Sequence, residues 1–175
     1  MLGPICPATP DDFDEVWQLY LDVCEHQARD QYGPRWTPGI YPAEGDIRSH
    51  MAEGELYVQR LGDQIVAAMA LVMREDPEYV GVPWPTKAAP EDVAVIHLLA
   101  VHPSARGLHV GVGLAREAVR LARAAGKRAV HLDVVPGNLA ASRVYLEAGF
   151  SLVGTYEIFY EDTGVMGFEM YECAL

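Results

Sequence analysis

Four polar side chains in the second half of the chain have types suited to chemistry, three of them to moving protons and one, an amide, to hydrogen bonding. His97 interrupts an apolar run, Asp133 lies in a second one, and Asn138 and Tyr145 follow. Positions i, i+3 and i+7 share one face of a helix, so Asn138, Ala141 and Tyr145 are expected to point the same way. A tyrosine has an ordinary pKa of about 10 and can therefore donate a proton at neutral pH. His97 and Asp133 are the candidates for accepting one.

A glycine-containing segment, residues 106–113 (RGLHVGVG), is expected to form a loop between a strand and a helix. Glycines let the backbone approach a ligand, and N–H groups at a helix N-terminus form an anion site. The segment has no Gly-Lys-Ser/Thr, which excludes a P-loop, and it lacks the third glycine of a dinucleotide fingerprint. It therefore predicts a site for a different phosphate-containing ligand.

The charge distribution supports a phosphorylated ligand in this part of the chain. The whole chain has a formal net charge of −12, yet residues 93–150 hold 7 basic and 3 acidic side chains. A solvated arginine face on the helix after the glycine segment is the alternative explanation. The acidic remainder argues against nucleic-acid binding and would attract a cationic partner.

The composition predicts one folded domain spanning residues 1–175. Half of the residues are hydrophobic, and no apolar run is long enough to cross a membrane. The first residues lack a basic region followed by an apolar one, so no signal peptide is expected. Cys6, Cys24 and Cys173 are far apart and form no metal-binding pattern, which favours free thiols, a cytoplasmic location and no metal site.

The periodicity of the apolar residues predicts an α/β fold with a mixed sheet of about seven strands and about four helices. The expected strands are residues 5–8, 55–61, 64–74, 93–101, 129–135, 152–160 and 168–175. The expected helices are residues 10–28, 43–52, 114–125 and 139–148. A hairpin turn is expected at Gly62-Asp63 and another turn at Asp162-Thr163-Gly164.

Two proline-rich segments are expected to lack regular structure. Residues 31–43 contain Trp36 and Tyr41, which either form a lid over an acceptor pocket or pin the loop to the core. Residues 75–92 contain Trp84, for which an exposed position or packing at an edge is expected, with contact to a substrate as the alternative.

The motifs resemble those of the GCN5-related N-acetyltransferase (GNAT) superfamily. Its acetyl-CoA loop, Arg/Gln-x-x-Gly-x-Gly/Ala, is similar to residues 106–111. Its later segment, Asn-x-x-Ala-x-x-x-Tyr-x-x-x-Gly-Phe, is matched at residues 138–150. One departure is His109, which stands where the family usually has the first glycine of the loop.

The resemblance implies a mostly antiparallel sheet, splayed between the fourth and fifth strands, and an acetyl-CoA-binding core over residues 93–150. It implies that N–H groups from about Leu108 to Gly113 hold the pyrophosphate of acetyl-CoA. It also implies contacts with the pantetheine arm from β-strand main chain and from Asn138, and Tyr145 as general acid for the departing thiolate. The implied cofactor-binding residues are Leu99, Ala100, Val101, Arg106, Gly107, Leu108, His109, Val110, Gly111, Val112, Gly113, Asn138 and Ser142.

The base that takes the proton of the acceptor is left open between two residues. His97 is two residues before Leu99, and strand alternation would place both on one side of the strand. The stretch around His97 looks like the strand of arylalkylamine N-acetyltransferases, in which a histidine relays protons. Asp133 has the spacing of the catalytic acid in ribosomal-protein N-terminal acetyltransferases. A buried, hydrogen-bonded His97 and a structural or charge-binding Asp133 are the alternatives.

These observations predict an enzyme that transfers the acetyl group of acetyl-CoA directly to a primary amine. A small-molecule amine is favoured because the acidic surface and the aromatic side chains of Trp36 and Tyr41 suit a compact cation. The alternatives are a protein N-terminus or lysine as acceptor, and a CoA-binding sensor without turnover. A homodimer is expected only by analogy of fold.

Overall fold

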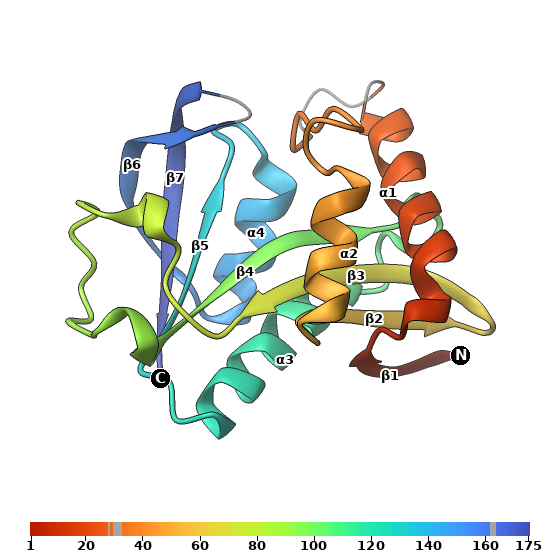
Figure 1. Cartoon of the computed structure of the whole chain (residues 1–175), viewed down its shortest axis with the longest axis horizontal. Helices are drawn as coiled ribbons and strands as arrows, with labels where there is room; N and C mark the ends of the chain where they lie inside the picture. Colours follow the sequence, from red (N-terminus) through yellow and green to blue (C-terminus); the bar gives the residue numbers. More distant parts are fainter. Residues whose placement is uncertain (28, 30–32, 162–163) are drawn as a thin grey trace. The chain divides into compact units, whose positions relative to one another are not determined.

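The computed structural model describes residues 1–27, 29, 33–161 and 164–175 (Figure 1). Residues 31 and 32 of the predicted lid, and Asp162 and Thr163 of the predicted turn, lie outside these ranges. The described α-helices are α1 (Phe13–Gln27), α2 (Glu44–Ala52), α3 (Val110–Ala124) and α4 (Leu139–Ala148). The described strands are β1 (Leu2–Pro7), β2 (Leu56–Leu61), β3 (Gln64–Val72), β4 (Val93–Val101), β5 (Ala129–Val134), β6 (Ser151–Tyr160) and β7 (Gly164–Ala174).

The strands form one seven-stranded sheet in the hydrogen-bonded order β1-β2-β3-β4-β5-β7-β6. β4 and β5 are parallel and are joined through α3, whereas β1–β2, β2–β3, β5–β7 and β6–β7 are antiparallel. The α/β class and the mixed, mostly antiparallel sheet are therefore confirmed. β4 and β5 pair only over Val93–Val95 and Ala129–His131, although both strands continue.

The chain divides into two compact units. The first contains Met1–Leu71 and His97–Leu114, and the second contains Val72–Ile96 and Ala115–Leu175. Both β4 and α3 contribute residues to each unit. The prediction of a single domain over residues 1–175 stays a prediction.

The first unit has a core between helices α1 and α2 and its strands. Figure 1 shows α1 and α2 side by side. Their inward faces bury Phe13, Val16, Tyr20 and Ile47 together with Leu98 of β4, as the helical spacing predicts. Gly62, with φ of 62°, allows the tight turn by which Leu61 pairs with Gln64, so the predicted hairpin is confirmed.

The second unit has its own core beneath the segment that joins β3 to β4. Figure 1 shows β5, β7 and β6 as neighbours with α4 beside them. Two aromatic residues of the joining segment, Tyr79 and Trp84, pack with Val93, Phe168 and Met170. Trp84 is buried, so an exposed position was wrong.

Several predicted boundaries need correction. α3 begins at Val110, four residues earlier than predicted, so half of the predicted glycine loop is the first helical turn. β7 also begins four residues earlier, at Gly164, because hydrogen bonds to β6 extend to Tyr160. Among the described residues, no helix is both long and apolar enough to cross a membrane.

Candidate functional site

The segment from Arg106 to Gly113 lies in the first unit and ends in the start of helix α3. Gly107 and His109 both have positive φ, 80° and 57°. His109 is exposed, and its carbonyl oxygen accepts the first helical bond, from Gly113 N–H at 3.0 Å. A positive φ is uncommon for a residue with a side chain and costs on the order of 1 kcal/mol. This geometry explains why a glycine at position 109 would be easier to accommodate.

Not all the N–H groups predicted to hold a pyrophosphate are available. Leu108 N–H donates to the Ala105 carbonyl at 3.3 Å, and Gly113 N–H is taken by His109. The N–H groups of Val110, Gly111 and Val112 belong to the first helical turn, where a helix offers no internal acceptor. The N–H groups predicted to hold the pyrophosphate are therefore reduced to those of this first turn. The positive end of the α3 helix dipole, which also favours an anion, lies at the same turn.

The strand that precedes this segment carries a local distortion at Leu98. This residue has φ of 56°, in the left-handed region that a branched side chain rarely adopts. The Tyr20 hydroxyl, fully buried on α1, donates to the Leu98 carbonyl at 2.7 Å. Strain held in place by a buried hydrogen bond is typical of functional sites, and sequence reasoning had missed it.

His97 lies next to this distortion and faces α2. Its ring stacks on that of His50, with 6.5 Å between centroids, and His50 Nδ1 lies 2.7 Å from Glu55 Oε2. The side chains of Leu98 and Ala100 pack into the same core as α2. His97 and Leu98 thus both contact the side of the strand that α2 covers, although neighbouring residues of a regular strand face opposite sides. The alternation that would place His97 and Leu99 on one side is therefore interrupted at Leu98.

The aromatic side chains of the predicted lid pack against the core of their own unit. The Trp36 ring lies 5.8 Å from that of Tyr20 and 6.2 Å from that of Tyr41, centroid to centroid. The Trp36 backbone is also held by Gln27, which accepts from its N–H at 3.1 Å. This arrangement favours the alternative in which the aromatics pin the loop.

The remaining predicted residues of β4 differ in burial. Ala100 is buried in the core of the first unit, whereas Leu99 and Val101 are partly exposed. The buried side chain of Ala100 is thus not available to a ligand, and the predicted contact at this residue can involve only its main chain.

In the second unit, Asn138 begins helix α4. Its side-chain oxygen accepts from Ala141 N–H at 3.2 Å, which satisfies a helix-start donor. The Ser142 hydroxyl lies 3.2 Å from both the Asn138 carbonyl oxygen and Glu169 Oε2, and its one proton can be donated to either. Asn138 therefore has a structural task, and its amide NH₂ remains as the group for a ligand.

Tyr145 follows on the same helix and is 7% exposed. Its ring contacts Phe150 and Tyr171, and its hydroxyl makes no hydrogen bond to the described residues. Burial, followed by the Asp133 carboxylate, raises the pKa of Tyr145 above its ordinary value. Gly149, with φ of 103°, ends the helix, so the predicted helix limits are confirmed.

Asp133 lies near the end of β5, within reach of two phenols that sequence reasoning had missed. Tyr79 and Tyr160 each donate to its Oδ2 at 2.7 Å. Tyr79 belongs to the proline-rich connection and Tyr160 to the end of β6. Neither position has a spacing signal to Asp133, because only the tertiary fold brings the three together.

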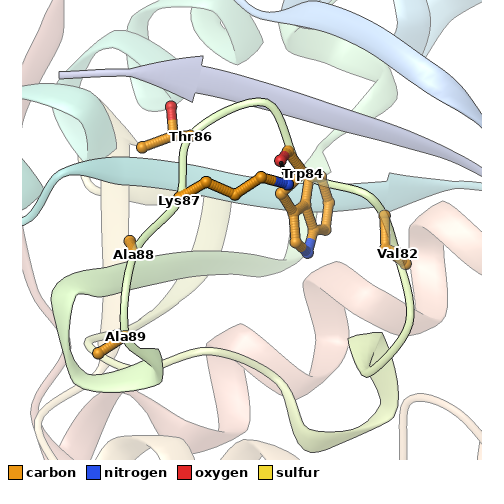
Figure 2. Close-up of a pocket in the computed structure, with 6 residues that line it drawn as sticks. All are labelled: Val82, Trp84, Thr86, Lys87, Ala88 and Ala89. Atoms are coloured by element: carbon orange, nitrogen blue, oxygen red, sulfur yellow. Dashed lines mark hydrogen bonds between the residues drawn. The ribbon is translucent and has the colours of Figure 1, made fainter.

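The second unit also contains an open surface pocket of about 450 Å³ at the loop between η2 (Pro77–Tyr79) and β4 (Figure 2). Its lining residues are Val82, Trp84, Thr86, Lys87, Ala88 and Ala89. None of the predicted site residues lines it. Among the described residues, no group of three or more His, Cys, Asp or Glu side chains could hold a metal ion.

The predicted site residues thus fall into two sets. The first unit holds residues 106–113, His97, the β4 residues, Trp36 and Tyr41, and the second holds Asp133, Asn138, Ser142 and Tyr145.

Comparison with known proteins agrees with the fold and the motifs. A structure described as a GNAT-family acetyltransferase from Streptococcus agalactiae has a TM-score of 0.78 at 16% identity and covers 99% of this chain and 95% of its own. A putative acetyltransferase from Salmonella typhimurium, solved with acetyl-CoA, has a TM-score of 0.67 at 15% identity, with 99% and 94% covered.

A curated relative, mycothiol acetyltransferase from Sanguibacter keddieii, is 27% identical in an alignment of length 164, which covers 78% of this chain. The chain spans about half the length of that relative, 52%. The model of the acetyltransferase (GNAT) family matches residues 16–150, which include both motifs. The chain belongs to this family.

Proposed function

We propose that this protein transfers the acetyl group of acetyl-CoA directly to a primary amine, and that the acceptor is a small molecule. The observation that carries the proposal is the buried Tyr145, whose hydroxyl makes no hydrogen bond to the described residues and whose pKa is raised. Such a phenol stays protonated at neutral pH and is available to a leaving group.

The reaction needs one bond to form and one to break. The amine nitrogen attacks the thioester carbonyl carbon, the C–S bond breaks, and the thiolate takes the proton of the Tyr145 hydroxyl. The nitrogen gives up a proton to a base, and water returns a proton to Tyr145. His97 stays one of the two candidates for this base that the sequence leaves open. The first turn of α3 supports binding of the pyrophosphate, because it offers N–H donors and a positive dipole end.

The preference for a small cationic acceptor rests on the negative charge of the protein and not on the predicted aromatic lid. Trp36 and Tyr41 pack onto the core of their unit, which weakens the argument that they close over an acceptor. The net charge of −12 and the partly exposed Asp133 carboxylate support a cationic amine. A protein N-terminus or lysine is the alternative acceptor.

The experiment is a screen of primary amines with acetyl-CoA that follows the release of free thiol. Tyr145→Phe should lower the rate by about 10²–10⁴-fold, because it removes only the proton donor. CoA binding, measured by calorimetry, should be unchanged. Tyr57→Phe, which removes a partly exposed hydroxyl on β2, is the control and should retain the full rate. Absence of CoA binding by the unmodified protein would contradict the proposal.

A further inference from the structure

The surroundings of Asp133 distinguish its two oxygen atoms. Oδ2 accepts two hydrogen bonds, from Tyr79 and from Tyr160, each at 2.7 Å. Oδ1 accepts none from any residue within the described ranges. The carboxyl group is partly exposed, so one oxygen is held and the other is open to a ligand.

The two phenols are firmly held donors. Tyr79 is 1% exposed and packs in the core of the second unit, and the Tyr160 ring meets Phe168 edge-on at 5.6 Å. Burial, followed by the charge of Asp133, raises the pKa of both Tyr79 and Tyr160. Both therefore remain protonated and can only donate to the carboxylate at neutral pH.

Two donated hydrogen bonds to one oxygen fix the orientation of the Asp133 carboxyl group and leave Oδ1 as its unengaged acceptor. A second carboxylate, Asp76, also acts on Tyr79 and Tyr160, so the region carries more than one negative charge. A fixed acceptor oxygen in a region of negative charge suits the binding of a cation.

We propose that Tyr79 and Tyr160 are positioning residues that hold Oδ2 of Asp133 in place, and that Oδ1 of Asp133 binds the ammonium group of a cationic acceptor. The inference rests on the proposed acetyl transfer and deepens it, because it assigns Asp133 to acceptor recognition and leaves proton removal to another group. Asp133 then sets the KM for the acceptor, and its loss has little effect on kcat.

The experiment compares two acceptors of equal chain length. A primary alkylamine is a cation at neutral pH, whereas the corresponding O-alkylhydroxylamine has an uncharged nucleophilic nitrogen. In the unmodified protein, KM should be lower for the alkylamine by about 10-fold or more, as for a hydrogen bond to a charged group. Asp133→Asn and Tyr79→Phe/Tyr160→Phe should abolish that difference, with kcat and the KM for acetyl-CoA nearly unchanged.

The control variant is Thr86→Val. It removes another hydroxyl-to-carboxylate hydrogen bond, from Thr86 Oγ1 to Glu172 at 2.9 Å, in the same connection as Tyr79. It should keep the preference for the cation. Thermal melts identify any variant that fails to fold, and Asp133→Asn tests the same idea without removing a core ring.

Three results would overturn the inference. They are a 100-fold fall in kcat for both acceptors in Asp133→Asn, an equal rise in both KM values, and equal KM values in the unmodified protein. If the unmodified protein releases no thiol with any amine, the proposed function fails. NMR titration with the alkylammonium then still decides the inference, because binding should be lost in Asp133→Asn and kept in Thr86→Val.

Discussion

Two polar side chains on the same face of β5, His131 and Asp133, have opposite surroundings. His131 is 1% exposed, and its two ring nitrogens lie 2.8 Å from Glu75 and 2.9 Å from Glu172. The Trp84 ring stacks on it at 3.6 Å between centroids. Asp133 is partly exposed and has only one oxygen engaged. A buried polar side chain whose hydrogen-bonding atoms all have protein partners stabilises the fold. A partly exposed side chain with one hydrogen-bonding atom unengaged is a candidate for ligand contact.

The His131 cluster connects three parts of the second unit. Glu172 is the cross-strand partner of His131 on β7, and it also accepts from the Thr86 N–H and hydroxyl. Carboxylates only accept, so both contacts of His131 are hydrogen bonds when each ring nitrogen carries a proton or one carboxyl group is protonated. The cluster thus connects the loop that lines the open pocket to strands β5 and β7, so the cluster has a structural role.

The largest effect is expected from His131→Leu. This change leaves Glu75 and Glu172 without the group between them, and breaking such a buried set costs about 3–5 kcal/mol. The free energy of unfolding should fall by that amount, and the melting temperature by roughly 6 to 20 °C for a chain of this length. Urea unfolding and thermal melts measure both.

A second variant separates lost charge pairing from lost packing. His131→Leu combined with Glu172→Leu removes one of the two carboxylates that have lost His131 as a partner. This double variant should regain part of the free energy of unfolding. The KM for the acceptor should stay the same in the folded fraction of either variant. A stability loss below about 1 kcal/mol for His131→Leu alone would remove the distinction between His131 and Asp133.

A smaller effect is expected from Tyr79→Phe at alkaline pH. Burial raises the pKa of Tyr79 in the folded protein, whereas an unfolded tyrosine has a pKa of about 10. Below pH 10 both states keep the proton, so this group does not change stability with pH. Above it the unfolded state loses the proton first, and stability falls by about 1.4 kcal/mol per pH unit.

The measurement is urea unfolding at pH 8 and pH 11. The loss of stability between these values should be about 1.4 kcal/mol smaller in Tyr79→Phe than in the unmodified protein. Thr86→Val retains the phenol and should keep the original pH dependence. An identical loss in Tyr79→Phe and the unmodified protein would show that this phenol does not ionise on unfolding.

The difference between the two β5 residues also shows what sequence could predict. Asn138, Tyr145 and Gly149 act within one helix, so their spacing predicted α4 to the residue. The partners of Asp133 and His131 come from distant parts of the chain, and no periodicity connects them. The burial of Trp84 depends on His131 in the same way, which is why its position was predicted wrongly.

Backbone strain was equally beyond sequence reasoning. Residue type predicts a positive φ for glycine, as at Gly107, but not for Leu98 or His109. Leu98 is held in this conformation by Tyr20, which belongs to another element. The anion site that the glycine motif predicts therefore stays a prediction, and the helix start at Val110 changes which N–H groups are available for it.

The smallest effect on stability is expected from Asp133→Asn. The amide oxygen of asparagine can still accept from Tyr79 and Tyr160, and the change removes a partly buried charge. The free energy of unfolding should therefore change by about 1 kcal/mol or less in urea, against the large loss for His131→Leu. The same variant should raise the KM for a cationic acceptor by about 10-fold. A stability loss as large as that of His131→Leu would instead make Asp133 a structural residue, because two hydrogen bonds to one oxygen of a partly exposed carboxyl group do not account for so large a loss.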